Sequence, residues 1–114
     1  MKYDYKLIEK IVTKDEVKEL LKYIAHENGL KYTLRKAAEE FTELALICLQ
    51  YINKIDPNKP TKQEIVDEIG DALMRIETVT TKLNICEHDI KERILHKSNK
   101  FLGYLKEGQY KHGI

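Results

Sequence analysis

The chain contains no tryptophan, only 2 prolines and only 5 glycines among its 114 residues. So few turn-forming residues argue against a β-sandwich, in which turns recur at short intervals. No apolar run reaches the ~20 residues that a membrane-spanning helix needs, and the first ten residues lack the apolar region of a signal peptide. We therefore expect a cytoplasmic protein with no membrane partner.

An excess of charge of either sign is missing too, because the net charge is +1 at pH 7. A nearly neutral chain has no general electrostatic attraction to nucleic acid, and we expect no such partner. Cysteine is scarce, and Cys48 and Cys86 fit no metal-binding spacing. Each lies in a segment with a helical pattern, which predicts buried, reduced thiols.

What the chain does contain is apolar residues at spacings of three and four, which is typical of amphipathic helices. Capping boxes, in which a Thr and a Glu three residues later each bond the other's backbone, mark two helix starts. The pattern predicts a helix from Thr13 that stops at Gly29, one from about Thr33 that ends before Pro57, one from Thr61 to about Asn84, and one from about His88 to Lys106.

These elements predict an all-α fold, a four-helix-type bundle of short amphipathic helices forming one domain over residues 1–114. Residues 1–12 fit a helical turn or an edge strand, with a slight preference for helix, and residues 108–114 look irregular. A bundle of this size buries a modest core. An apolar face left uncovered would favour completion of the bundle by oligomerisation.

Two acidic segments resemble each other: EEFTELAL begins at Glu39, and DEIGDALM begins at Asp67, 28 residues later. At 100° per residue on a helix, we expect Phe41 and Ile69 to face the core. Each helix then carries two carboxylates one turn apart beside its apolar stripe. These carboxylates belong to Glu40, Glu43, Glu68 and Asp71.

An antiparallel hairpin of the two helices would bring the four carboxylates together, and we expect the small residues Thr42 and Gly70 to allow close approach of the backbones. Like charges at this spacing repel by roughly 0.2–0.5 kcal/mol per pair, and a cation would remove that repulsion. Oxygen ligands without Cys or His suit Mg²⁺ or Mn²⁺ better than Zn²⁺. Either segment alone is more simply an ordinary solvated face, and only the repetition favours a metal site.

The motif EExxE (Glu39, Glu40, Glu43), followed after 24 residues by ExxD (Glu68, Asp71), resembles the MazG-like all-α nucleoside triphosphate pyrophosphohydrolases. The resemblance covers Leu30 to about Leu105. It implies that Glu40, Glu43, Glu68 and Asp71 bind Mg²⁺, with Mn²⁺ as a substitute. It also implies that Glu39 is an extra acid that orients or deprotonates water in catalysis.

The same resemblance implies a reaction and an assembly. An NTP or dNTP would be cleaved between its α- and β-phosphates to a monophosphate and pyrophosphate, by a homodimer or homotetramer. In the segment HKSNKF, the residues Lys97, Asn99 and Lys100 resemble the substrate-binding element of some members, although a solvated helix face is an equally good interpretation. The missing tryptophan and the lack of an Arg-rich close leave the nucleobase pocket unidentified.

The alternative function is a non-catalytic helical module that senses nucleotides or binds another protein. Such a module keeps the helices but does not need all four carboxylates. Divalent-ion binding separates a plain interaction module from a carboxylate metal site, and turnover separates a nucleotide sensor from an enzyme.

Overall fold

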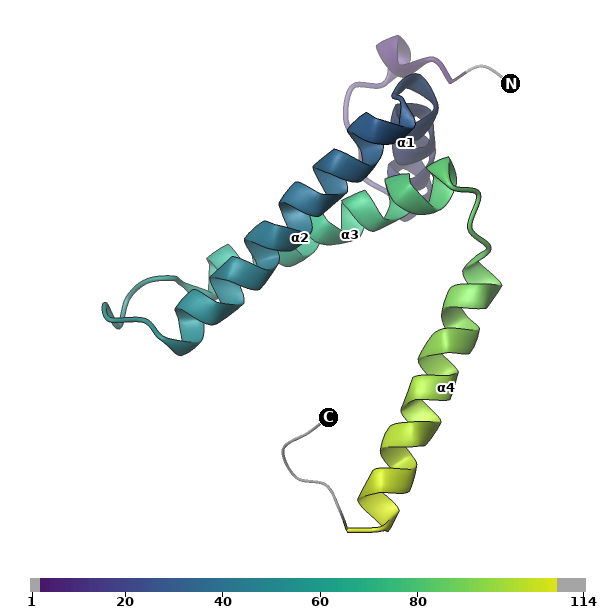
Figure 1. Ribbon diagram of the computed structural model, residues 1–114. Helices are drawn as coiled ribbons and strands as arrows, with labels where there is room; N and C mark the ends of the chain where they lie inside the picture. The colour runs from purple at the N-terminus through teal and green to yellow at the C-terminus, as the bar shows by residue number, and fades with distance from the viewer. Residues whose placement is uncertain (1–2, 109–114) are drawn as a thin grey trace. The chain divides into compact units, whose positions relative to one another are not determined.

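The computed structural model describes residues 3–108, and in this range the chain is helical, with no strand (Figure 1). Helices make up 76% of the structure, which confirms the predicted all-α class. A short 3₁₀ turn, η1 (Tyr5–Leu7), precedes four helices: α1 (Lys14–Glu27), α2 (Leu30–Ile52), α3 (Lys62–Lys82) and α4 (Glu87–Lys106).

Both predicted capping boxes are present. The Thr61 backbone N–H donates to Glu64 Oε2 and the Glu64 N–H donates to Thr61 Oγ1, each at 3.1 Å, and Thr13 and Glu16 form the same pair. These bonds satisfy donors that the first helical turn leaves without a partner. At the other end of α3, Asn84 adopts a φ of 53°, a left-handed conformation that Asn tolerates better than most residues.

Two predicted boundaries differ from the structure. The second helix begins at Leu30 and not near Thr33, because the Gly29 carbonyl accepts the first helical bond from the Thr33 backbone N–H at 3.0 Å. Before α1, the expected helix is reduced to the three residues of η1, where Leu7 is exposed. The Tyr3 and Tyr5 rings lie 5.2 and 5.5 Å from the Tyr23 ring, which ties this segment to α1.

Contacts between residues divide the chain into two compact units, Met1–Asn84 and Ile85–Ile114. In the first unit α2 and α3 lie side by side as an antiparallel hairpin, and α1 packs against α3 (Figure 1). The second unit contains α4, none of whose residues is buried. Among the described residues, no helix is both long enough and apolar enough to cross a membrane.

The core of the first unit is small. Its buried apolar residues are Leu21 and Ala25 of α1, Ala37 of α2 and Ala72 of α3. Thr78 is buried as well, and its hydroxyl donates to the Arg75 carbonyl at 2.8 Å, so this polar group is satisfied.

The expectation that Phe41 and Ile69 face the core is wrong, since their side chains are 41% and 44% exposed. The buried and half-buried residues of α2 follow a neighbouring stripe that includes Thr33, Ala37, Glu40, Leu44 and Ile47. Those of α3 include Ile65, Glu68, Ala72, Arg75, Thr78 and Val79. Each helix carries two adjacent stripes, and the hairpin buries the one that includes an alanine and a carboxylate.

Two related expectations fail for the same reason. Gly70 provides no close approach, because a Cβ added there would meet no atom within 4 Å, and Thr42 is exposed. The small buried residues of these helices are Ala37 and Ala72. The thiols are exposed as well: Cys48 lies beside Phe41 on the unburied stripe of α2, and Cys86 precedes α4.

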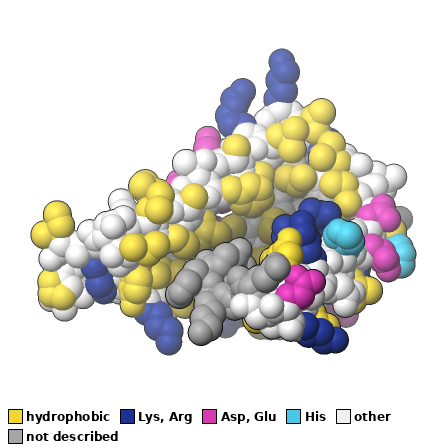
Figure 2. All heavy atoms as spheres, turned by 60° about the horizontal axis from the view of Figure 1, so that its bottom comes forward, with side chains coloured by type: hydrophobic (Ala, Val, Ile, Leu, Met, Phe, Trp, Pro, Cys, Tyr) yellow, Lys and Arg dark blue, Asp and Glu magenta, His cyan; other side chains and the backbone are white. Residues whose placement is uncertain are grey.

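The exposed stripes of the two helices form what we call the outer face of the hairpin, made of Leu34, Phe41, Cys48 and Ile52 of α2 with Val66, Ile69, Leu73 and Ile76 of α3. At 100° per residue in two antiparallel helices, both stripes point to the same side, away from Glu43 and Asp71. Figure 2 shows one face of the molecule, on which many hydrophobic side chains (yellow) are exposed. The hairpin thus has an acidic side and an apolar side.

We expect Thr61→Ala to lower the free energy of unfolding by about 1 kcal/mol, because the cap bonds at the start of α3 are lost. Denaturant unfolding at fixed protein concentration measures this change. Thr42→Ala is the matched control: its hydroxyl bonds the Ala38 carbonyl within α2, and we expect almost no loss. Equal stability of the two variants would contradict the role of the cap.

Candidate functional site

The predicted carboxylates of α2 and α3 meet in the structure. One oxygen each from Glu40, Glu68 and Asp71 lie within 4.8 Å of one another. Glu40 comes from α2 and the other two come from α3, so the antiparallel hairpin brings together groups that are 28 residues or more apart. Two of the three, Glu40 and Glu68, lie on the stripe where the helices pack.

The fourth predicted ligand, Glu43, lies beside this cluster. Its side chain is exposed, and its negative charge raises the pKa of both Glu40 and Glu68. All four acids identified from the repeat therefore interact with one another. We call them the carboxylate cluster.

Burial is the largest cause of the raised pKa of Glu40 and Glu68, followed by the negative charges of Glu43 and Asp71. Glu40 Oε2 and Glu68 Oε2 are inaccessible to solvent and have no hydrogen-bond partner. A buried carboxylate oxygen without a partner is costly unless a proton or a cation compensates it. A proton or a cation bound at the cluster would lower this cost.

The donor set suits a hard divalent cation, since it consists of carboxylate oxygens. Oxygens on opposite sides of an octahedral Mg²⁺ are about 4 Å apart, given Mg–O distances of about 2.1 Å. The three carboxylate oxygens lie within 4.8 Å of one another, which is comparable with that separation. The oxygen donors of Glu40, Glu68 and Asp71, with Glu43 beside them, are thus chemically compatible with a hard divalent cation.

Glu39, predicted to act on water, lies outside the three-residue group. Its Oε2 accepts a hydrogen bond from Lys36 Nζ at 3.3 Å. Glu39 and Glu43 line the same open hollow of about 410 Å³, together with Arg35, Ala38 and Thr42. Two further acids of α3 have local partners: Glu64 belongs to the cap, and Asp67 accepts a bond from Gln63 Nε2 at 2.8 Å.

Lys97, Asn99 and Lys100 lie on α4, in the second unit, and all three are exposed. Lys97 and Lys100 are three residues apart and therefore neighbours on the helix surface. The Lys97 ammonium is 5.6 Å from the centre of the Phe101 ring. Their predicted role in substrate binding stays a prediction.

Arg75 belongs to the site although the sequence pattern did not predict it. A cavity of about 170 Å³ adjoins the carboxylate cluster, lined by Glu40, Asp71 and Arg75 together with Leu21, Ile24, Met74 and Thr78. The Arg75 charge acts on Glu40 and lowers its pKa, against the larger effects that raise it. Its spacing could have revealed it, because Arg75 is four residues after Asp71 and so lies on the same face of α3.

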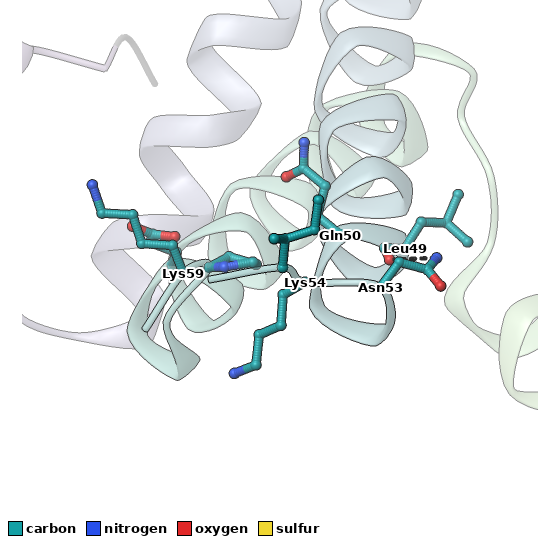
Figure 3. Close-up of a pocket in the computed structure, with 8 residues that line it drawn as sticks. Leu49, Gln50, Asn53, Lys54 and Lys59 are labelled. Atoms are coloured by element: carbon teal, nitrogen blue, oxygen red, sulfur yellow. Dashed lines mark hydrogen bonds between the residues drawn. The ribbon is translucent and has the colours of Figure 1, made fainter. Parts of the chain in front are cut away.

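A second hollow, of about 520 Å³, lies at the far end of the hairpin, where Leu49, Gln50 and Asn53 meet Lys54 and Lys59 of the loop (Figure 3). The acid that lines it is Glu64, whose carboxylate already accepts the Thr61 N–H. This hollow therefore offers no cluster of groups for metal binding or acid–base chemistry. The carboxylate cluster is the better candidate site.

Comparisons with known proteins add no assignment. No family model matches the chain, no curated protein matches it, and no solved structure matches it.

The raised pKa of Glu40 and Glu68 gives a testable pH dependence. Above their ordinary pKa of 4.5, the folded protein holds more protons than the unfolded chain, so its stability falls as pH rises through the raised values. In EDTA, we expect Glu68→Gln to be more stable than the wild type at pH 7, with the difference vanishing near pH 4. Chemical unfolding across this pH range measures it.

Glu19→Gln is the control for this titration, because Glu19 is an exposed residue of α1 paired only loosely, at 3.9 Å, with Lys22. Its stability difference from the wild type should stay small at every pH. A Glu68→Gln protein that is less stable than the wild type at pH 7 without metal would show that the cluster is not electrostatically unfavourable.

Proposed function

We propose that this protein is a Mg²⁺-dependent nucleoside triphosphate pyrophosphohydrolase of the MazG-like kind. The single observation that carries the proposal is the carboxylate cluster, in which two buried oxygens lack a partner at the interface of α2 and α3. The spacing EExxE…ExxD supports the choice of reaction, since it resembles the acidic motifs of that family.

In this proposal Glu40, Glu43, Glu68 and Asp71 hold the metal. When bound, Mg²⁺ would neutralise phosphate charge and lower the pKa of a coordinated water. By holding the ion at one place, the four carboxylates would set where the phosphates of the substrate lie. The proposed reaction is attack of water on the α-phosphorus with cleavage of the α–β bridge, which yields a monophosphate and pyrophosphate.

Glu39 is the proposed acceptor for the proton of the attacking water. Its exposed carboxylate shares an open hollow with Glu43 and accepts a hydrogen bond from Lys36. Lys97 and Lys100 are proposed to hold oxygens of the leaving pyrophosphate as point charges, and Asn99 to donate or accept a hydrogen bond.

We also propose that the protein is a homodimer or homotetramer. The outer face exposes large apolar side chains of both hairpin helices, and Leu73 is 58% exposed. Such a continuous apolar surface is unusual on a monomer. Two hairpins packed through this face would form a four-helix-type bundle and would leave the acidic side of each hairpin open.

We expect Mg²⁺ to stabilise the wild type, by about 2.7 kcal/mol at a concentration 100 times its Kd, since the ion binds only the folded cluster. Glu40→Gln and Asp71→Asn should lose this stabilisation. On a panel of NTPs and dNTPs with Mg²⁺, the wild type should release pyrophosphate, and both variants should be slower by at least about 100-fold. Chromatography of the products separates pyrophosphate from orthophosphate.

Glu92→Gln, an exposed acid of α4, is the control and should behave as the wild type. Full metal-dependent activity in Glu40→Gln and Asp71→Asn would refute the ligand assignment, and release of orthophosphate would refute the reaction. Metal binding without turnover of any nucleotide would instead favour the non-catalytic sensing module.

For the assembly, we expect Leu73→Glu to be monomeric in sedimentation velocity at a concentration where the wild type is oligomeric, because a charge cannot be buried in the outer face without a partner. Ile55→Glu is the control: Ile55 is fully exposed in the hairpin loop, and its variant should remain oligomeric. A monomeric wild type at high micromolar concentration would contradict the proposed oligomer.

A further inference from the structure

The cavity between α1 and α3 has apolar walls and a charged rim. Leu21 and Thr78 are buried within it, whereas Asp71 and Met74 are exposed. Leu21 and Ile24 form the apolar wall of the cavity, and Met74 lies at its exposed edge. Glu40 and Asp71, which are proposed to bind metal, line the same cavity. Apolar walls with a few polar groups are typical of a site for an organic ring.

Its volume limits what can enter. The cavity measures about 170 Å³, well below the roughly 300–1,000 Å³ of sites that enclose a whole drug-sized ligand. An apolar cavity of about 150 Å³ in another protein accepts benzene, a single six-membered ring. The volume therefore matches a single ring better than the fused double ring of a purine.

Charge excludes the phosphates from the same space. Glu40 and Asp71 line the cavity and would repel a triphosphate that no metal ion shields. The phosphates belong on the metal side of these acids. The cavity is then left for the other end of a bound nucleotide, its base.

Hydrogen-bond donors in the cavity point to the kind of ring. The Thr78 hydroxyl already donates to the Arg75 carbonyl, and ionised carboxylates only accept. Among the side chains that line the cavity, the guanidinium of Arg75 is thus the remaining donor, and within the described residues it forms no ion pair shorter than 4.0 Å. A guanidinium matches a ring carbonyl oxygen, which every pyrimidine base carries next to its glycosidic nitrogen.

We propose that this cavity binds the base of a pyrimidine nucleotide and that Arg75 recognises a ring carbonyl oxygen. The proposal rests on the proposed function for the reaction, but the pocket can bind a nucleotide whether or not the nucleotide is cleaved. It makes Arg75 a specificity residue of the site. It also assigns a role to α1, which supplies Leu21 and Ile24 to the pocket.

Turnover of UTP, CTP, dUTP, dCTP, ATP and GTP with Mg²⁺ tests the selectivity. We expect kcat/KM to be at least tenfold higher for the pyrimidines. Arg75→Met should lower kcat/KM for pyrimidines by about 10- to 100-fold, mainly through KM, because a hydrogen bond to a charged donor is lost.

Met74→Ala, at the exposed edge, should enlarge the cavity and shift the ratio of the pyrimidine to the purine kcat/KM at least tenfold towards purines. Arg93→Met on α4 is the matched control and should match the wild type.

Calorimetric titration of UMP, CMP, AMP and GMP in Mg²⁺ reads the pocket without turnover. The pocket is supported if UMP or CMP binds more tightly than AMP and GMP and if Arg75→Met weakens that binding. This result supports the pocket even if no triphosphate is hydrolysed and the proposed reaction fails. Equal use of purines and pyrimidines would overturn the pocket while leaving the reaction intact. The pocket would also be overturned if Arg75→Met weakened the binding of every nucleotide equally and abolished the stabilisation by Mg²⁺. Arg75 would then only position Glu40. Failure of UMP and CMP to bind would overturn it as well.

Discussion

The packing of α2 against α3 places two carboxylates where apolar side chains would ordinarily lie, and the first unit is organised around this conflict. Glu40 and Glu68 occupy the stripe that also carries Ala37 and Ala72, and each has an oxygen with neither solvent nor a hydrogen-bond partner. Burying such groups opposes folding, and the neighbouring acids increase the cost. The arrangement makes physical sense when a cation is bound, because one ion compensates several charges at once.

The conflict also explains the division of the hairpin into two sides. The inner stripe includes the small and acidic residues Ala37, Glu40, Glu68 and Ala72, whereas the large apolar residues Phe41, Ile69 and Leu73 remain outside. On one side the hairpin offers charge, with a cavity that α1 completes; on the other it offers an apolar surface suited to a second hairpin. The proposed metal site and the proposed association would both follow from the way α2 packs on α3.

Much of the local structure could be predicted from the sequence, because it depends on neighbours in the chain. The capping boxes at Thr13 and Thr61 lie where the pattern put them, and the repeated acidic segments led to the acids that meet in space. What failed was the choice of face. Phe41 and Ile69 are more apolar than the alanines and carboxylates of the buried stripe. Hydrophobic periodicity identifies two adjacent stripes on each helix, but it does not indicate which of them the partner helix covers.

The sequence by itself determined the helices, their caps and the chemistry of the acidic repeat, since these depend on residue type and spacing along the chain. Only the tertiary structure decided which stripe is buried, that Cys48 is exposed, and that Arg75 shares a cavity with Leu21 and Ile24. Those facts depend on how α1 and α3 pack. Their contacting residues are dozens of positions apart, and no local pattern encodes the volume left between them.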